Sequence, residues 1–220
     1  MTRLVALVVE GQTEEAFVTR VLQPHIGFDA ATLMPIVVHT SRAANGTAFR
    51  GGGSWKHYER QIRGLLAQPH WSCVTTLIDF YGYPSDAPAC SCTGSHTQPD
   101  CVAGRERGIR QSLPYDARFE PFVALHEFET LVIAAAAQSA EVLGEATLPA
   151  RFQQLINSFD GNAELINDGP LTAPSKRVLT MIPDYRKVRD GVSILEGELA
   201  GALLLTPRFA SWVDRIAGRT

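Results

Sequence analysis

The chain lacks a long hydrophobic run. The apolar stretch at residues 4–9 is interrupted by Glu10. A membrane-spanning helix needs roughly 20 apolar residues, and a secretory leader needs an apolar core followed by a cleavage site. We therefore expect a cytoplasmic protein without a membrane segment.

The chain also has few cysteines and no excess of basic charge. Four cysteines in 220 residues, three of them at Cys90, Cys92 and Cys101, do not make the dense pattern of a small secreted disulfide domain, so we expect no disulfides. The net charge of -3 provides no basic excess of the kind usual in proteins that neutralise many phosphates. Any binding of nucleic acid must therefore depend on a local cluster of basic residues.

The length and composition suit one globular domain. Hydrophobic residues make up 45% of the chain, enough for a full core, and no linker or internal repeat divides it. We predict a single domain over residues 1–220. A segment rich in Pro, Ser, Cys, Thr and Gly at about residues 84–104 is predicted to be a loop insertion.

Short apolar strands alternate with helices along the first two thirds of the chain. Strands are predicted at residues 4–9, 33–39, 74–78 and 122–125. Helices are predicted to follow Thr13 and Ser54 as N-caps, around residues 105–113, and at residues 130–137, whereas residues 40–54 are predicted to be a loop. This order predicts an α/β fold with an open, mainly parallel sheet between helices.

Acidic residues follow three of these strands. Glu10 follows the first, Asp79 the third, and Glu127 and Glu129 the last. Ligands of open α/β sheets bind beyond the carboxyl ends of the strands, so these acids are expected to converge. Clustered carboxylates repel one another unless a cation neutralises them, and oxygen ligands alone favour Mg²⁺ or Mn²⁺.

Each acid also has a purely structural explanation. Glu14 lies in the first turn of a helix, where the helix dipole favours an acid, and Glu127 and Glu129 have the same explanation. Asp79 is also suited to start a turn. Glu10 fits this explanation least, because a fully apolar strand precedes it and Gly11 allows a sharp turn.

A second segment has the composition of a phosphate site. Pro174 is suited to the first turn of a helix, and Ser175, Lys176 and Arg177 follow it. Cations at this end oppose the helix dipole, which a bound phosphate would relieve. Lys187 is expected to extend the positive surface. The alternative is a solvated basic face.

The cysteine-containing segment offers ligands for zinc. Cys90, Cys92, His96 and Cys101 are enough for a tetrahedral site. The single residue between Cys90 and Cys92 is one fewer than zinc turns usually have. A loop of reduced thiols is the alternative.

Several motifs together resemble a known family. Glu10-Gly11-Gln12-Thr13-Glu14-Glu15 after an apolar strand is similar to the opening motif of Toprim domains, the topoisomerase-primase fold that also occurs in overcoming-lysogenization-defect nucleases. The wider set, at residues 78–84, 126–131, 166–169, 172–177 and 185–188, resembles the bacterial family of domain of unknown function 4276, which is regarded as Toprim-like.

The resemblance implies a function that composition does not reveal. Relatives of the fold bind Mg²⁺ and cut or rejoin phosphodiesters, and some nuclease relatives work beside an ATPase in phage defence. By motif position Glu10, Glu14 and Asp79 match the acidic motifs. Position 81 is Tyr where the second Asp of an Asp-x-Asp pair is usual.

We therefore expect a nuclease with Mg²⁺ or Mn²⁺ as cofactor. Its metal ligands would be Glu10, Glu14, Asp79, and Glu127 or Glu129, with Glu10, Asp79 and Lys176 as the catalytic residues. A non-catalytic subunit that binds nucleic acid, or a small-molecule phosphohydrolase, would use the same fold. A full acidic cluster argues against the first alternative, and the second needs a closed pocket.

Overall fold

The computed structural model describes residues 2–42, 48–50, 53–90, 99–167 and 171–219. Its centre is a parallel sheet in the order β2-β1-β5-β6, with β7 also paired to β5. The strands are β1 (Arg3–Val9), β2 (Ala31–Val37), β5 (Cys73–Asp79), β6 (Phe119–Glu120) and β7 (Val123–Ala124). The predicted α/β fold with a parallel sheet is confirmed.

Strand β1 lies between β2 and β5 and is covered on both faces. Val5, Leu7 and Val9 belong to one hydrophobic core, whereas Ala6 and Val8 belong to the other. A strand with side chains buried on both faces reads as a continuous apolar run. Because all pairings in this sheet are parallel, the carboxyl ends of β1, β5 and β7 lie at one edge.

The strand predicted at residues 122–125 is shorter in the structure, where it is β7 (Val123–Ala124), and β6 lies just before it. Pro121, which has no backbone N–H, follows β6 and interrupts the ladder. The side chain of Thr76 replaces the missing backbone pairing: the N–H of Phe122 donates to Thr76 Oγ1 (2.8 Å), and that hydroxyl donates to the carbonyl of Phe122 (2.8 Å). The edge of the sheet therefore continues to β7.

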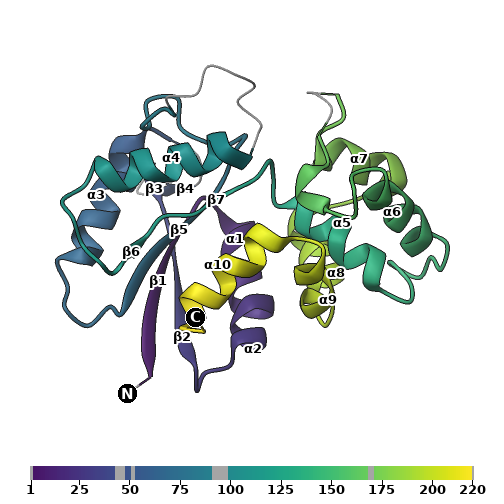
Figure 1. The fold of residues 1–220 in the computed structure, drawn as a ribbon, viewed down its shortest axis with the longest axis horizontal. Helices are drawn as coiled ribbons and strands as arrows, with labels where there is room; N and C mark the ends of the chain where they lie inside the picture. Colours follow the sequence, from purple (N-terminus) through teal and green to yellow (C-terminus); the bar gives the residue numbers. More distant parts are fainter. Residues whose placement is uncertain (1, 43–47, 51–52, 91–98, 168–170, 220) are drawn as a thin grey trace.

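Helices cover both faces of the sheet (Figure 1). The helices α3 (Trp55–Leu66) and α4 (Pro99–Gln111) contribute to one core. The other core is covered by the consecutive helical segments α1 (Gln12–Phe17), η1 (Val18–Leu22) and α2 (Gln23–Ile26), and by α10 (Pro207–Ala217). Trp212 of α10 donates from Nε1 to Thr75 Oγ1 of β5 (2.9 Å), which fixes the last helix to the sheet.

The remaining helical segments form a group beside the sheet, drawn in green to yellow-green in Figure 1. They are α5 (Glu129–Gln138), α6 (Leu148–Asn157), η2 (Ala163–Leu165), α7 (Pro174–Met181), η3 (Lys187–Gly191), α8 (Val192–Leu195) and α9 (Leu199–Leu204). Helix α5 is buried along most of its length because apolar residues surround it on all sides. Among the residues that the structure describes, no helix is long and apolar enough to cross a membrane.

Three local predictions are wrong. Residues 40–54 are not all loop, because β3 (His39–Arg42) and β4 (Ala48–Arg50) form an antiparallel pair. Thr13 is not the N-cap of the first helix: that helix begins at Gln12 after Gly11. Helix α4 begins at Pro99, within the segment predicted to be a loop insertion. Ser54, by contrast, is the N-cap of α3 as predicted, accepting from the N–H of Lys56.

Candidate metal-binding and catalytic site

Four carboxylates and one ammonium group meet at the carboxyl edge of the sheet. Lys187 Nζ lies 3.3 Å from Asp79 Oδ2, 3.6 Å from Glu14 Oε1 and 3.7 Å from Glu129 Oε2. Glu10 joins this group electrostatically, since the charges of Asp79 and Glu14 both act on its pKa. We call the four acids and Lys187 the acidic cluster.

The turn after β5 holds Glu10 in place. A Cβ atom on Gly82 would lie 2.5 Å from Glu10 Oε2 and 2.7 Å from Oε1, which is closer than real Cβ contacts. Only a glycine therefore allows the carboxylate to lie against this turn. The sharp turn at Gly11 was predicted from the sequence, whereas the close approach of Gly82 was not.

Glu14 has two roles in the structure. Its Oε2 accepts from the backbone N–H of Gly11 (3.0 Å), which caps the start of α1. Its Oε1 faces Lys187 (3.6 Å). Glu14 therefore both caps the start of α1 and belongs to the acidic cluster.

Burial is the main electrostatic feature of the acidic cluster. It raises the pKa of Glu10 to about 7, with further increases from the charges of Asp79 and Glu14. The pKa of Glu129 also rises to about 7 for the same main reason, and that of Glu14 rises too. Burial acts to lower the pKa of Lys187, but the charges of the nearby carboxylates outweigh it and raise that pKa. The carboxylates are thus held together at a cost that one ammonium group does not fully offset.

A buried hydroxyl group adjoins the acidic cluster. Tyr58 of α3 is fully buried, and its hydroxyl has no hydrogen-bond partner among the described residues. Burial, then the charges of Glu10, Glu14 and Asp79, raise the pKa of Tyr58. A buried hydroxyl without a partner costs free energy, so its place beside these acids indicates a missing polar neighbour. No sequence pattern predicted that Tyr58 lies beside these acids.

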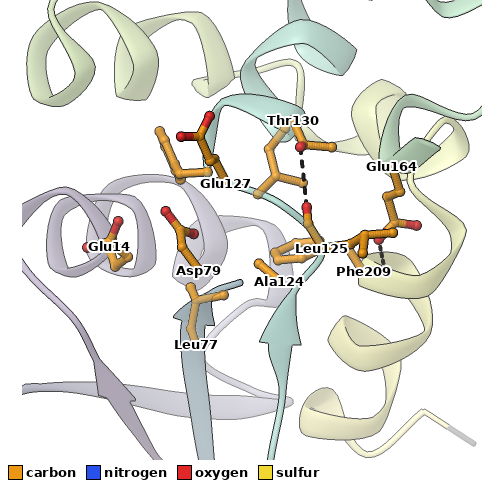
Figure 2. A pocket seen from close by; sticks show the side chains of 11 residues that line it. Glu14, Leu77, Asp79, Ala124, Leu125, Glu127, Thr130, Glu164 and Phe209 are labelled. Carbon is orange, nitrogen blue, oxygen red and sulfur yellow. Dashed lines mark hydrogen bonds between the residues drawn. The ribbon is translucent and has the colours of Figure 1, made fainter. Parts of the chain in front are cut away.

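Glu127 lies at the rim and binds the start of α7. Figure 2 shows its side chain facing the same cavity as those of Glu14 and Asp79. Its Oε2 accepts from the backbone N–H of Ser175 (2.9 Å), and its Oε1 accepts from Ser175 Oγ (3.2 Å). In this structure the anion at the start of α7 is therefore a carboxylate of the chain itself, where the sequence predicted a phosphate.

The other predicted phosphate ligands do not form one site. Arg177 donates from Nε to the carbonyl of Thr172 (3.0 Å) and lies over the ring of Phe159. Lys176 is exposed on α7. Lys187 is the one predicted phosphate ligand whose side chain reaches the acidic cluster, and the predicted role of all four as phosphate ligands remains a prediction.

His126 and Tyr81 lie next to the acids. His126 has a positive φ of 69° and is buried, and its Nδ1 has no partner among the described residues. Burial lowers its pKa to about 4, so it is neutral at pH 7. Its ring lies 5.8 Å from that of Tyr81, which is exposed at 41%. A strained residue beside a cluster of acids is typical of a functional site, and single-sequence patterns do not reveal it.

The cavity beside the acidic cluster is small. It is lined by Glu14, Asp79 and Glu127 and by apolar residues such as Leu125 and Phe209 (Figure 2). Its volume of about 10 Å³ is enough for about one water molecule. A small organic ligand therefore has no enclosed pocket at this place.

The predicted zinc ligands are only partly described. Cys92 and His96 lie outside the described residues. Cys90 is disulfide-bonded, which corrects the expectation of no disulfides, whereas Cys73 is a free, buried cysteine. Cys90 Sγ lies 2.7 Å from Cys101 Sγ. The four-ligand zinc site stays a prediction.

The donor chemistry of the acidic cluster fits a hard divalent cation. Across the described ranges, no three His, Cys, Asp or Glu side chains are already spaced to hold a metal ion, and Lys187 lies among the acids instead. The available donors are nevertheless carboxylate oxygens, which Mg²⁺ and Mn²⁺ prefer, and the unpartnered hydroxyl of Tyr58 lies nearby. A bound cation would also offset the cost of burying the acids together.

Comparison with known families finds one match. The model of the family described as Domain of unknown function (DUF4276) matches residues 9–217. The resemblance seen in the motifs is thereby confirmed over nearly the whole chain, while the relation to Toprim domains stays a prediction. No curated protein matches the chain.

Proposed function

The chain belongs to the DUF4276 family, and we propose that it is a divalent-metal-dependent phosphodiesterase that cuts DNA. The observation that carries this proposal is the convergence of Glu10, Glu14, Asp79 and Glu129 at the carboxyl edge of a parallel sheet. Two of these acids have a pKa raised to about 7. Acids with perturbed pKa values are candidates for a functional site, and ligands of open α/β sheets bind at this edge.

Each acid has a place in the proposed reaction. Glu10, Glu14, Asp79 and Glu129 would hold Mg²⁺ or Mn²⁺, which lowers the pKa of water and offsets charge on the phosphate. The ammonium group of Lys187 is close enough to the same place to meet a phosphate oxygen. Lys176 lies on the exposed face of α7, where it would contact the nucleic-acid backbone further from the cut bond.

An extended substrate suits this site better than a small one. The cavity holds about one water molecule, so the scissile phosphate must approach from the open side. Tyr81 is exposed at 41% on that edge and offers a ring on which a base can stack. As formed by the described residues, this cavity is too small to enclose an organic ligand, which argues against a small-molecule phosphohydrolase.

A non-catalytic subunit is the second candidate, and the identity of residue 81 favours it. Tyr81 occupies the place of a second acid in related motifs, so Glu129 would have to serve as the metal ligand that Tyr81 cannot provide. In either case we propose a cytoplasmic protein that binds nucleic acid and works beside an ATPase, as in phage defence. This setting is taken from the resemblance to overcoming-lysogenization-defect nucleases.

The test is the Asp79→Asn variant, assayed for cleavage of plasmid and single-stranded DNA with Mn²⁺. Cleavage should be lost. The melting temperature in chelator should change little, because the lost contact with Lys187 is offset by weaker repulsion among the acids. Asp184→Asn, on an exposed side chain, is the matched control and should cut normally. Wild-type protein that does not cut with Mg²⁺ or Mn²⁺ would shift the assignment to the non-catalytic subunit.

A further inference from the structure

Lys187 has an unusual position for a lysine. The chain contains only three lysines, and the other two, Lys56 and Lys176, are exposed. The ammonium group of Lys187 instead lies within 3.7 Å of three carboxylates. Those carboxylate side chains are 5 to 11% exposed, whereas Lys187 is 36% exposed. The lysine thus reaches into a buried acidic site from the solvent side.

A short π-helical segment aims this side chain. Lys187 is the first residue of η3, and the N–H of Arg186 donates to Asp190 Oδ2 (2.7 Å), which closes the turn. Gly191 ends η3, and a Cβ atom there would lie 2.5 Å from the hydroxyl of Tyr185. π-Helical turns are rare and occur often at functional sites.

The ammonium group and a divalent cation require the same carboxylate oxygens. Asp79, Glu14 and Glu129 are the proposed metal ligands and are also the three partners of Lys187. Two cations held by one set of oxygens would repel each other strongly at this separation. Binding of the metal therefore requires Lys187 to withdraw.

We propose that Lys187 is an internal counter-ion of the metal-free site, and that a divalent cation displaces it toward solvent. The inference rests on the proposed function, because it assumes that the acids bind metal. Because its side chain is 36% exposed, Lys187 has a path outward without unfolding of the core. Once displaced, the ammonium group lies at the mouth of the site, where the phosphate of the substrate arrives. Lys187 is thus a positioning residue that couples metal loading to phosphate binding.

The test is a calorimetric titration of Lys187→Met with MnCl₂ in the absence of DNA. The variant should bind Mn²⁺ at least about tenfold more tightly than wild type, since no ammonium group competes for the acids. A tenfold change corresponds to about 1.4 kcal/mol. A purely structural role would predict the opposite, because a disordered site binds metal less well. Lys56→Met makes the same chemical change on an exposed side chain of α3 and should leave the affinity unchanged.

A measurement on the wild-type chain covers the case in which Lys187→Met does not fold. With ¹³C-labelled lysine, the three side chains give three NMR signals. Saturating MgCl₂ should shift the signal of Lys187 and leave that of Lys56 in place.

The outcomes separate the two proposals. Tighter Mn²⁺ binding by Lys187→Met, or the selective shift in wild type, supports the inference. Wild type that binds Mn²⁺, with equal or weaker binding by a folded Lys187→Met, overturns the counter-ion role and leaves the metal site standing. An unmoved Lys187 signal at saturating Mg²⁺ has the same meaning. If neither protein binds Mn²⁺, the metal-dependent function fails and the inference fails with it.

Discussion

Replacement of Glu129 by glutamine should stabilise the metal-free protein at alkaline pH. Glu129 is only 4% exposed, and burial raises its pKa from 4.5 to about 7. In the unfolded chain the carboxyl group ionises near its ordinary value. Between these two values the folded state binds more protons than the unfolded state, so the free energy of unfolding falls as pH rises through this window.

The size of this effect follows from the two pKa values. Each pH unit between them corresponds to about 1.4 kcal/mol. The raised pKa of Glu129 therefore lowers the free energy of unfolding by on the order of 3 kcal/mol at pH 8 and on the order of 1 kcal/mol at pH 5. Glutamine has nearly the same shape and does not ionise. The stability of Glu129→Gln relative to wild type should thus increase by about 2 kcal/mol from pH 5 to pH 8.

The assay is urea unfolding of both proteins at several pH values in the presence of a chelator. His126 contributes to the pH dependence in the opposite direction, because burial lowers its pKa to about 4. That contribution is the same in both proteins and cancels in the difference. Glu141→Gln, on an exposed side chain, is the control and should follow wild type at every pH.

Addition of Mn²⁺ should reverse the order of stability at pH 8. Metal binds only the folded state and stabilises it by mass action, and wild type keeps the carboxylate that the variant lacks. A stability difference between wild type and Glu129→Gln that does not change between pH 5 and pH 8 in chelator would refute the electrostatic argument for the cluster.

Three further predictions concern neighbouring residues. Glu127→Gln should lower the free energy of unfolding by about 1 kcal/mol in chemical denaturation, because Ser175 loses a charged acceptor at the start of α7. The Mn²⁺ affinity of this variant should stay within a few-fold of wild type. A complete loss of Mn²⁺ binding would make Glu127 a ligand instead. Gly82→Ala should weaken Mn²⁺ binding about tenfold or more in calorimetry, because the added Cβ would lie 2.5 Å from Glu10 Oε2 and push that carboxylate away. Unchanged affinity would show that Glu10 is not a ligand. Lys176→Ala should keep the Mn²⁺ affinity of wild type and weaken DNA binding. Fluorescence anisotropy at two salt concentrations should show a smaller salt dependence of DNA binding than in wild type. Unchanged DNA binding would remove Lys176 from the nucleic-acid surface.

Sequence patterns were reliable where a structural feature is local. The apolar run of β1 requires helices on both faces, and the acids at Glu10 and Asp79 follow strands that must end at the same edge of a parallel sheet. Ser54 and Pro174 also mark the starts of their helices, because capping depends on residues close in the chain. The α/β fold and the meeting of the acids are thus readable without coordinates.

Local patterns failed where a distant residue replaces the expected partner. The basic first turn of α7 predicts phosphate binding, which remains a prediction, but it did not reveal that the carboxylate of Glu127, 48 residues before Ser175, accepts hydrogen bonds at that end. The strand predicted at residues 122–125 is shortened to Val123–Ala124, because Pro121 breaks the ladder and Phe122 pairs with the side chain of Thr76 on the neighbouring strand. Neither the contact between Glu127 and Ser175 nor the one between Thr76 and Phe122 can be recognised from neighbouring residues in the sequence.

The sequence by itself determined the sheet, its covering helices and the edge at which Glu10 and Asp79 gather, because periodicity and strand ends are properties of neighbouring residues. Only the tertiary structure decided what balances those acids. Lys187 lies 108 residues from Asp79 along the chain, and its ammonium group reaches the cluster because η3 packs beside α1 and α5. Burial of the carboxylates, which raises the pKa of Glu10 and Glu129, likewise depends on the complete fold, since the loss of surrounding water requires every layer to be in place.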